Sequence, residues 1–320
     1  WRARALMAKQ PASTTTLPQA LMALQSIAGH HGFYEQLALE ELGQKITLPA
    51  RPAPPTPAEM DAVKNNPGFE RAVHAIRLGI RQEGVKEWNY AAGLVDAQGK
   101  RGRMTDREKQ AAAQWACEME IWDRCISSTE RTSQYDVNHR FPMPFKEEVL
   151  SRTRDINLEA AYVYGLIRQE SRFVINARSN VGASGLMQVM PRTAKWTAKK
   201  IGLKNFQPDQ LNQRDTNIAI GTGYLKLVLD NFHGSMPMAA AAYNAGPSRP
   251  RKWRNGPLLE GAIWTECIPF TETRDYVKKV LSNTTAYAAL ITGEPQSLKA
   301  RLGKIGPREK SEPEDDNDLP

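Results

Sequence analysis

The stretch NLEAAYVYGLIRQESRF occupies residues 157–173. Its apolar side chains recur every three or four residues and predict one helix, with a buried stripe through Leu166, Ile167 and Phe173. Glu170 falls on that stripe, where a carboxyl group is unusual. Burial disfavours the charged form and raises the pKa, so Glu170 could donate a proton near neutral pH. The alternative is a structural glutamate that pairs with an arginine or caps neighbouring backbone.

Small and polar residues gather at three places after this helix. The first place is SNVGASGLMQVMP at residues 179–191, where the small residues let a ligand approach the backbone and Gln188 stands among apolar neighbours. The others are AYNAGP at residues 242–247 and IPFTETRDY at residues 268–276. These clusters strengthen the interpretation of Glu170 as a catalytic residue.

Four motifs in order resemble the catalytic domain of the soluble lytic murein transglycosylases. They are RQES at 168–171, GASGLMQ at 182–188, AYNAG at 242–246, and IPF with ETR and Tyr276 at 268–276. The match covers roughly residues 150–290. The helices before it resemble, more loosely, the end of the α-superhelical region and the linker domain of that family.

The resemblance implies a mainly α fold, in which a superhelical region precedes a lysozyme-like, goose-type-like catalytic domain. It implies cleavage of the β-1,4 bond between N-acetylmuramic acid and N-acetylglucosamine in peptidoglycan without water. Glu170 matches the single acid/base, which yields a 1,6-anhydro sugar and requires no cofactor or metal. One carboxyl group suffices chemically because the nucleophile, the 6-hydroxyl, is already tethered to the substrate.

The resemblance also implies a set of residues along the saccharide groove. They are Ser179, Gln188, Met190, Tyr243, Asn244 and Glu272. Tyr243 is further expected to hydrogen-bond Glu170. Structural alternatives stay open, since Met190 could belong to the core, Asn244 could cap a turn and Glu272 could pair with Arg274.

The N-terminal half predicts short helices without enzymatic motifs. Helices are expected from Thr16 to Gly29 and from Phe33 to Gly43, followed by a proline-rich connector over residues 49–57. Capping boxes begin at Thr56 and Thr105, and an apolar stripe between residues 111 and 126 predicts core packing. We expect three parts: residues 1–147, the superhelix end and linker; residues 148–292, the catalytic domain; and residues 293–320, an extension where the apolar pattern fades into an acidic tail.

The charge distribution suits an anionic partner. The chain has 43 Lys and Arg against 35 Asp and Glu, a net charge of +8. Residues 306–320 carry six acidic and two basic side chains, which leaves +12 for the rest. A segment with this positive charge favours binding to polyanions in general. The expected partners are peptidoglycan strands and proteins of cell-wall synthesis or recycling, and no base-reading motif supports nucleic acid. The expected location is the periplasm of a Gram-negative bacterium, with outer-membrane association and a leader left open.

The three cysteines do not form a metal-binding pattern, because CxxC and HExxH motifs are missing. Cys117 and Cys125 are eight residues apart, which on one continuous helix separates their Cα atoms by about 12 Å, beyond disulfide reach. We therefore expect three buried free thiols, including Cys267, unless a turn falls between the first two. Two functional rivals remain: a hydrolytic muramidase, and a non-catalytic helical scaffold that binds glycan or protein.

Overall fold

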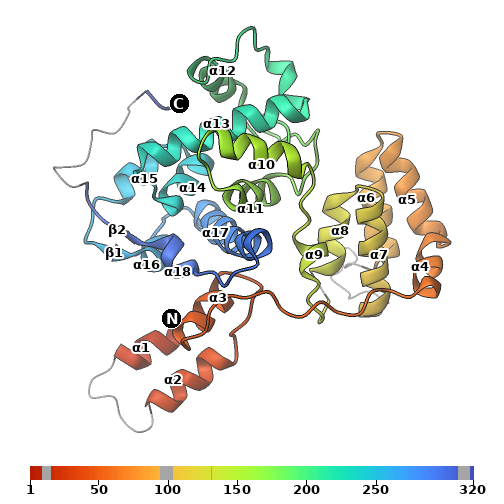
Figure 1. The fold of residues 1–320 in the computed structure, drawn as a ribbon, viewed down its shortest axis with the longest axis horizontal. Coiled ribbons are helices and arrows are strands. Elements are labelled where there is room, and N and C mark those ends of the chain that lie inside the picture. The colour runs from red at the N-terminus through yellow and green to blue at the C-terminus, as the bar shows by residue number, and fades with distance from the viewer. Residues whose placement is uncertain (9–15, 94–103, 131, 309–317) are drawn as a thin grey trace. The chain divides into compact units, whose positions relative to one another are not determined.

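The computed structural model describes residues 1–8, 16–93, 104–130, 132–308 and 318–320 (Figure 1). These residues pack into two compact units. Unit 1 comprises residues 1–48, 145–171 and 175–320, and unit 2 comprises residues 49–144 and 172–174. Helices dominate both, so the predicted mainly α fold class is confirmed.

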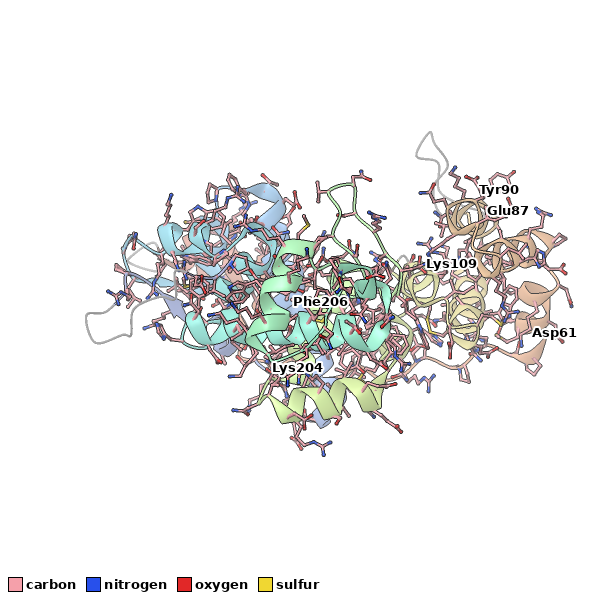
Figure 2. The ribbon with its side chains drawn as sticks, turned by 90° about the horizontal axis from the view of Figure 1, so that it is seen from above. Asp61, Glu87, Tyr90, Lys109, Lys204 and Phe206 are labelled. Atoms are coloured by element: carbon pink, nitrogen blue, oxygen red, sulfur yellow. A yellow bond between two sulfur atoms is a disulfide. The ribbon has the colours of Figure 1, made fainter. Side chains whose placement is uncertain are left out.

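Unit 2 is a set of short helices around an aromatic core. Its helices are α4 (Pro57–Lys64), α5 (Pro67–Arg77), α6 (Arg81–Ala91), α7 (Asp106–Glu118), α8 (Trp122–Thr129) and α9 (Val137–Arg140). Both predicted capping boxes are present, one at Thr56 and one at Thr105. The rings of Trp88 and Trp115 stack with centroids 6.0 Å apart and form the centre of the core. Figure 2 shows Glu87 and Tyr90 of α6, and Tyr90 is 83% exposed.

The expectation of three buried free thiols was wrong. The stripe between residues 111 and 126 divides into α7 and α8, with Glu120 in the left-handed region at φ 58° between them. This turn folds Cys125 back to 5.2 Å from Cys117, Cα to Cα, and the two form a disulfide. Cys267 is free but exposed rather than buried.

Unit 1 contains the remaining elements. They are α1 (Arg2–Ala8), α2 (Thr16–Gln25), α3 (Phe33–Glu41), α10 (Lys146–Asp155), α11 (Ala160–Glu170), α12 (Pro191–Lys200), the 3₁₀ helix η1 (Pro208–Asn212), α13 (Arg214–Asn231), α14 (Met236–Ala245), α15 (Ser248–Trp253), β1 (Leu259–Glu260), α16 (Gly261–Glu266), α17 (Thr271–Thr292), α18 (Leu298–Leu302) and β2 (Lys304–Ile305). The long helix α17 packs along α11, α14 and α18 (Figure 1). It is the central element of the unit.

The helix predicted over residues 157–173 is shorter than expected. Asn157 takes φ 49°, and α11 begins only at Ala160 and ends at Glu170. Arg172 and Phe173 then take φ values of 49° and 67°. Glu170 therefore lies at the end of the helix, although Leu166 and Ile167 are fully buried as predicted.

The parts at either end of the chain pack together in unit 1. Residues 1–48 group with the C-terminal half rather than with residues 49–144. The apolar pattern does not fade after residue 292, since Leu298, Leu302 and Ile305 are buried. There β2 pairs antiparallel with β1, Ile305 opposite Leu259. The three expected parts remain a prediction about family domains.

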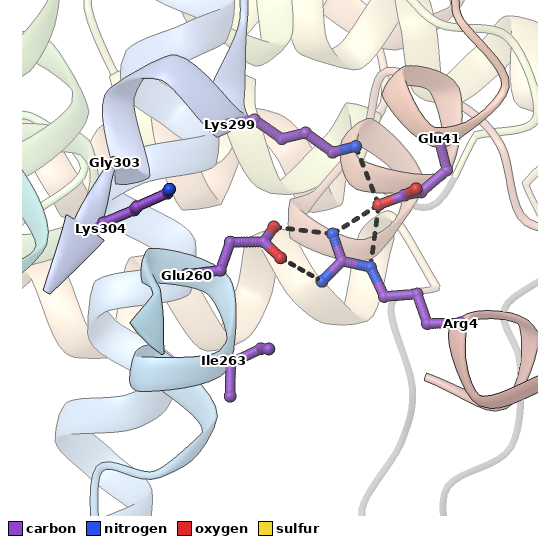
Figure 3. A pocket seen from close by; sticks show the side chains of 7 residues that line it. All are labelled: Arg4, Glu41, Glu260, Ile263, Lys299, Gly303 and Lys304. Carbon is purple, nitrogen blue, oxygen red and sulfur yellow. Dashed lines mark hydrogen bonds and ion pairs between the residues drawn. The ribbon is translucent and has the colours of Figure 1, made fainter. Parts of the chain in front are cut away.

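A cluster of charges ties the first helices to the end of unit 1. Arg4 of α1 donates to Glu41 of α3 and to both carboxylate oxygens of Glu260 in β1, and Lys299 of α18 also pairs with Glu41 (Figure 3). These side chains and Lys304 line an open pocket of about 660 Å³. Because the pocket's carboxylates are paired with its own cations, we assign the cluster a structural role.

Candidate active site

Glu170, the last residue of α11, has the properties of a general acid. Burial around its carboxyl group raises the pKa to about 7. A hydrogen bond from Tyr276 opposes that rise, and the negative charge of Glu272 adds to it. The pKa of Glu170 is therefore raised, as the sequence predicted. Glu170 as a residue nevertheless keeps partial contact with solvent.

Tyr276 of α17 fixes the orientation of this carboxyl group. Its hydroxyl donates a hydrogen bond of 2.5 Å to Oε1 of Glu170. Burial and the adjacent Glu170 charge raise the pKa of Tyr276 well above the usual value, so the phenol stays protonated and remains a donor. Because Oε1 accepts from Tyr276, Oε2 is the oxygen on which the acid form carries its proton.

The loop over residues 177–189 is folded by its own polar side chains. Ser179 Oγ accepts from the backbone N–H of Ala183 at 2.9 Å. Gln188, at φ 46°, donates through Nε2 to the carbonyls of Ala177 and Gly185. Both predicted groove residues thus shape the loop, and their contact with saccharide stays a prediction.

The side chain of Asn217 in α13 holds this loop by hydrogen bonds to its backbone. Its Oδ1 accepts from Met187 N at 2.8 Å, and its Nδ2 donates to the carbonyls of Ser184 and Leu211. Gly185 is required beside it, because φ is +80° and a Cβ there would lie 2.0 Å from Asn217 Nδ2. The side chain of Asn217 is fully buried, so all three bonds are shielded from water.

Tyr243 and Asn244, at the end of α14, connect the loop to α17. The hydroxyl of Tyr243 donates to Met187 O at 2.8 Å, not to Glu170, so the expected hydrogen bond belongs to Tyr276 instead. Tyr243 is nonetheless close, since the charge of Glu170 helps to raise its pKa. Asn244 accepts from the Thr273 hydroxyl at 2.7 Å.

The remaining two predicted residues are accessible. Met190, the residue before α12, is 40% exposed and so does not belong to the core. Glu272 is exposed in the first turn of α17. The expected alternative partner of Glu272, Arg274, donates to Ile268 O and Thr271 Oγ1. The structure thus brings Tyr243 and Glu272 each within electrostatic range of Glu170.

Two contributors had no assigned role in the sequence. Tyr276 stood in the motif at residues 268–276, four residues after Glu272 and so on the same helix face, which was a usable signal. Asn217 carried no motif. In the part of the chain that the structure describes, no group of three or more His, Cys, Asp or Glu side chains could hold a metal ion.

Residues 149–257 match the family model of the transglycosylase SLT domain, and residues 267–296 match that of the soluble lytic transglycosylase helical domain. The chain therefore contains a transglycosylase SLT domain. The resemblance drawn from the four motifs is thereby confirmed. The site residues described above lie within these two matched ranges.

Two curated relatives are both named soluble lytic murein transglycosylase. The soluble lytic murein transglycosylase of Salmonella typhimurium is 33% identical over 279 residues, which is 86% of this chain and 41% of the relative. That of Escherichia coli K12 is 31% identical over 281 residues, 87% of this chain and 42% of the relative. The chain therefore spans less than half the length of these curated relatives.

Solved structures agree on the SLT fold. An inactive glutamate-to-glutamine mutant of lytic transglycosylase Slt from Pseudomonas aeruginosa superposes with a TM-score of 0.81 at 34% identity, covering 96% of this chain and 48% of that one. A complex of the 70-kDa soluble lytic transglycosylase with bulgecin A gives 0.75 at 26% identity, covering 93% and 46%. The predicted superhelical and lysozyme-like architecture is consistent with these relatives over nearly the whole chain.

Proposed function

We propose that the chain is a lytic transglycosylase that cleaves the β-1,4 bond between N-acetylmuramic acid and N-acetylglucosamine in peptidoglycan. The observation that carries the proposal is the carboxyl group of Glu170, with a pKa of about 7 and an oriented hydrogen bond from Tyr276. A group with that pKa exchanges its proton readily at neutral pH. The match of residues 149–257 to the transglycosylase SLT domain supports the same reaction.

In the first step, the proton on Oε2 of Glu170 passes to the glycosidic oxygen, and the bond from that oxygen to C1 of the muramic acid breaks. The Tyr276 hydrogen bond stabilises the carboxylate that is left, because a donor favours the charged form. In the second step, the carboxylate takes the proton of the muramic acid 6-hydroxyl while the oxygen of that hydroxyl bonds to C1. The product is a 1,6-anhydro sugar, and Glu170 regains its proton.

The tethered hydroxyl explains how one carboxyl group can serve both steps. Attack within one molecule can reach effective molarities of about 10⁵ to 10⁸ M when the geometry is right. A separate nucleophilic carboxylate or a bound water is then unnecessary. Ser179, Gln188, Met190, Tyr243, Asn244 and Glu272 are proposed to line the groove that holds the sugars in that geometry.

A hydrolytic muramidase is the second candidate, and Glu272 is the observation in its favour. The negative charge of Glu272 contributes to the raised pKa of Glu170. Most glycoside hydrolases use a pair of carboxyl groups for catalysis. The products separate the two candidates, because hydrolysis leaves a reducing muramic acid end that is heavier by one water than the anhydro product.

The test is mass spectrometry of fragments released from purified peptidoglycan. The parent chain and a Glu147→Gln variant, which loses an exposed carboxylate of α10, are expected to release anhydro-muropeptides, and Glu170→Gln is not. Reducing ends from the parent would support the muramidase instead. Release by Glu170→Gln at the parent rate would remove Glu170 from the mechanism, and no release by any variant would favour the non-catalytic scaffold.

The periplasm of a Gram-negative bacterium is the proposed location. The Cys117–Cys125 disulfide supports it, because disulfides persist in oxidising compartments. None of the helices in the described ranges is long and apolar enough to cross a bilayer. Association with the outer membrane and with proteins of cell-wall synthesis or recycling completes the proposal, and pull-down from periplasmic extract would test the latter.

A further inference from the structure

A cationic side chain lies on an exposed aromatic ring beside the proposed groove. The guanidinium carbon of Arg249 in α15 lies 5.0 Å from the ring centroid of Phe270. Arg249 Nη1 also donates to the carbonyl of Ala245 at 2.7 Å, which fixes the side chain from a second direction. Trp253 of the same helix meets Phe270 edge-on, with centroids 5.5 Å apart. We call Arg249, Trp253 and Phe270 the platform.

The platform adjoins residues assigned to the groove. Ala245, which accepts from Arg249, directly follows Asn244 in α14. Phe270 precedes α17, whose first turn holds Glu272. The bond between Thr273 and Asn244 joins these two helix ends. The platform therefore adjoins the residues proposed to form the groove wall.

The charge of Arg249 is available to a ligand. Its interactions within the described residues are those with Ala245 and Phe270, and neither neutralises the guanidinium. Phe270 is 46% exposed, although a large apolar ring is normally buried. A planar guanidinium held on an aromatic face keeps its outer N–H groups free to bind a carboxylate in a bidentate manner.

We propose that Arg249 determines specificity by binding a carboxylate of the peptide stems attached to muramic acid. The inference rests on the proposed function, because the peptide stems are the acidic groups that a glycan strand in the groove would carry. Their recognition beside the sugars would favour strands that retain peptides over denuded strands. The platform thereby holds the strand in register while Glu170 reacts.

The experiment compares two substrates: peptidoglycan strands with peptides, and the same strands after an amidase has removed them. We expect Arg249→Gln to raise KM about tenfold on the first substrate, the typical effect of losing a hydrogen-bonded charge, and to leave kcat/KM on the second unchanged. Lys252→Gln removes an exposed charge from the same helix, and is expected to match the parent on both substrates. Arg249→Lys should be intermediate.

Equal losses on both substrates, with a lower melting temperature, would reduce Arg249 to a cap of α14 and overturn the inference. An unchanged KM on strands with peptides would overturn it as well. If the parent forms no anhydro product, the proposed function fails separately. The affinities of Glu170→Gln and Glu170→Gln/Arg249→Gln for the two strands then test Arg249 without turnover.

Discussion

Gly165 of α11 and Thr284 of α17 lie so close that a Cβ at position 165 would come within 2.5 Å of Thr284 Oγ1. It would also lie 2.8 Å from the backbone nitrogen of Thr284, so a side-chain rotation could not relieve the contact. This close approach brings the two helices together one and a half turns before Glu170. The hydrogen bond between Tyr276 and Glu170 is made across the same interface.

Gly165→Ala should therefore separate α11 from α17. We expect a destabilisation of about 1 to 3 kcal/mol from overpacking, with a fall in kcat because Tyr276 no longer reaches Glu170. Thermal unfolding and steady-state kinetics would measure both. Gly256→Ala is the matched control, since nothing lies within 4 Å of its Cβ position. Equal behaviour of the two variants would show that the helix contact does not position the site.

Tyr276→Phe should raise the pKa of Glu170 further, because it removes the donor that favours the carboxylate. We expect a rise of about one unit and a lower kcat. Titration of the Glu170 carboxyl carbon by NMR reports the pKa without activity. Tyr162→Phe, whose hydroxyl donates to Met236 O instead, is expected to leave that titration in place. A pKa unchanged in Tyr276→Phe would contradict the assigned hydrogen bond.

The raised pKa of Glu170 also predicts how stability depends on pH. Between the usual value of 4.5 and about 7, the unfolded chain releases this proton and the folded chain keeps it. The contribution of Glu170 to stability is therefore complete below 4.5 and is lost as the pH rises through 7. Glu170→Gln has no such proton to lose. Its free energy of unfolding relative to the parent should therefore rise by about 3 kcal/mol from pH 4 to pH 8. Denaturant unfolding at both pH values measures it, and a constant difference would contradict the burial of the carboxyl.

Asn217→Ala should destabilise the loop over residues 177–189. The change leaves Met187 N without its partner in a buried place and removes one donor each from Ser184 O, which still accepts from Val189 N, and from Leu211 O. We expect the loss of these three bonds to cost about 3 kcal/mol. It should also lower activity, since Gln188 belongs to that loop. Asn212→Ala, at an exposed position nearby, is the control in urea unfolding. A loss below 1 kcal/mol would mean that other contacts hold the loop.

Reduction of the Cys117–Cys125 disulfide should destabilise unit 2 by about 2 to 3 kcal/mol, as expected for so short a loop. Unfolding of the parent with and without reductant would show the shift, and the Cys117→Ser/Cys125→Ser variant should be insensitive to reductant. Parent curves that coincide in both conditions would argue against the disulfide.

Local patterns predicted much of this molecule. The capping boxes at Thr56 and Thr105, the burial of Leu166 and Ile167, and the shift of the Glu170 pKa all follow from residues adjacent in sequence or on one helix face. The groove residues came from motifs rather than geometry. Periodicity over residues 157–173 overran both ends of the helix, because the pattern does not register the left-handed turns at Asn157 and Arg172.

Contacts between distant segments were beyond such reasoning. The sequence predicted Tyr243 as the partner of Glu170, whereas the packing of α17 on α11 brings Tyr276 to it instead. The disulfide was missed because a stripe of period 3.6 passes unchanged through the turn at Glu120. Asn217 binds residues about 30 positions earlier, and its type alone indicates nothing.

The pairing of β1 with β2 limits how this fold can be divided into modules. The family model ends at residue 257, just before β1, whereas the chain returns through α18 so that Gly261 abuts Leu302. A chimaeric enzyme that received residues 149–257 alone would lack β1, α18 and β2, which pack together after that range. Exchange of catalytic domains between members of the family would have to carry residues up to Ile305 as one cassette.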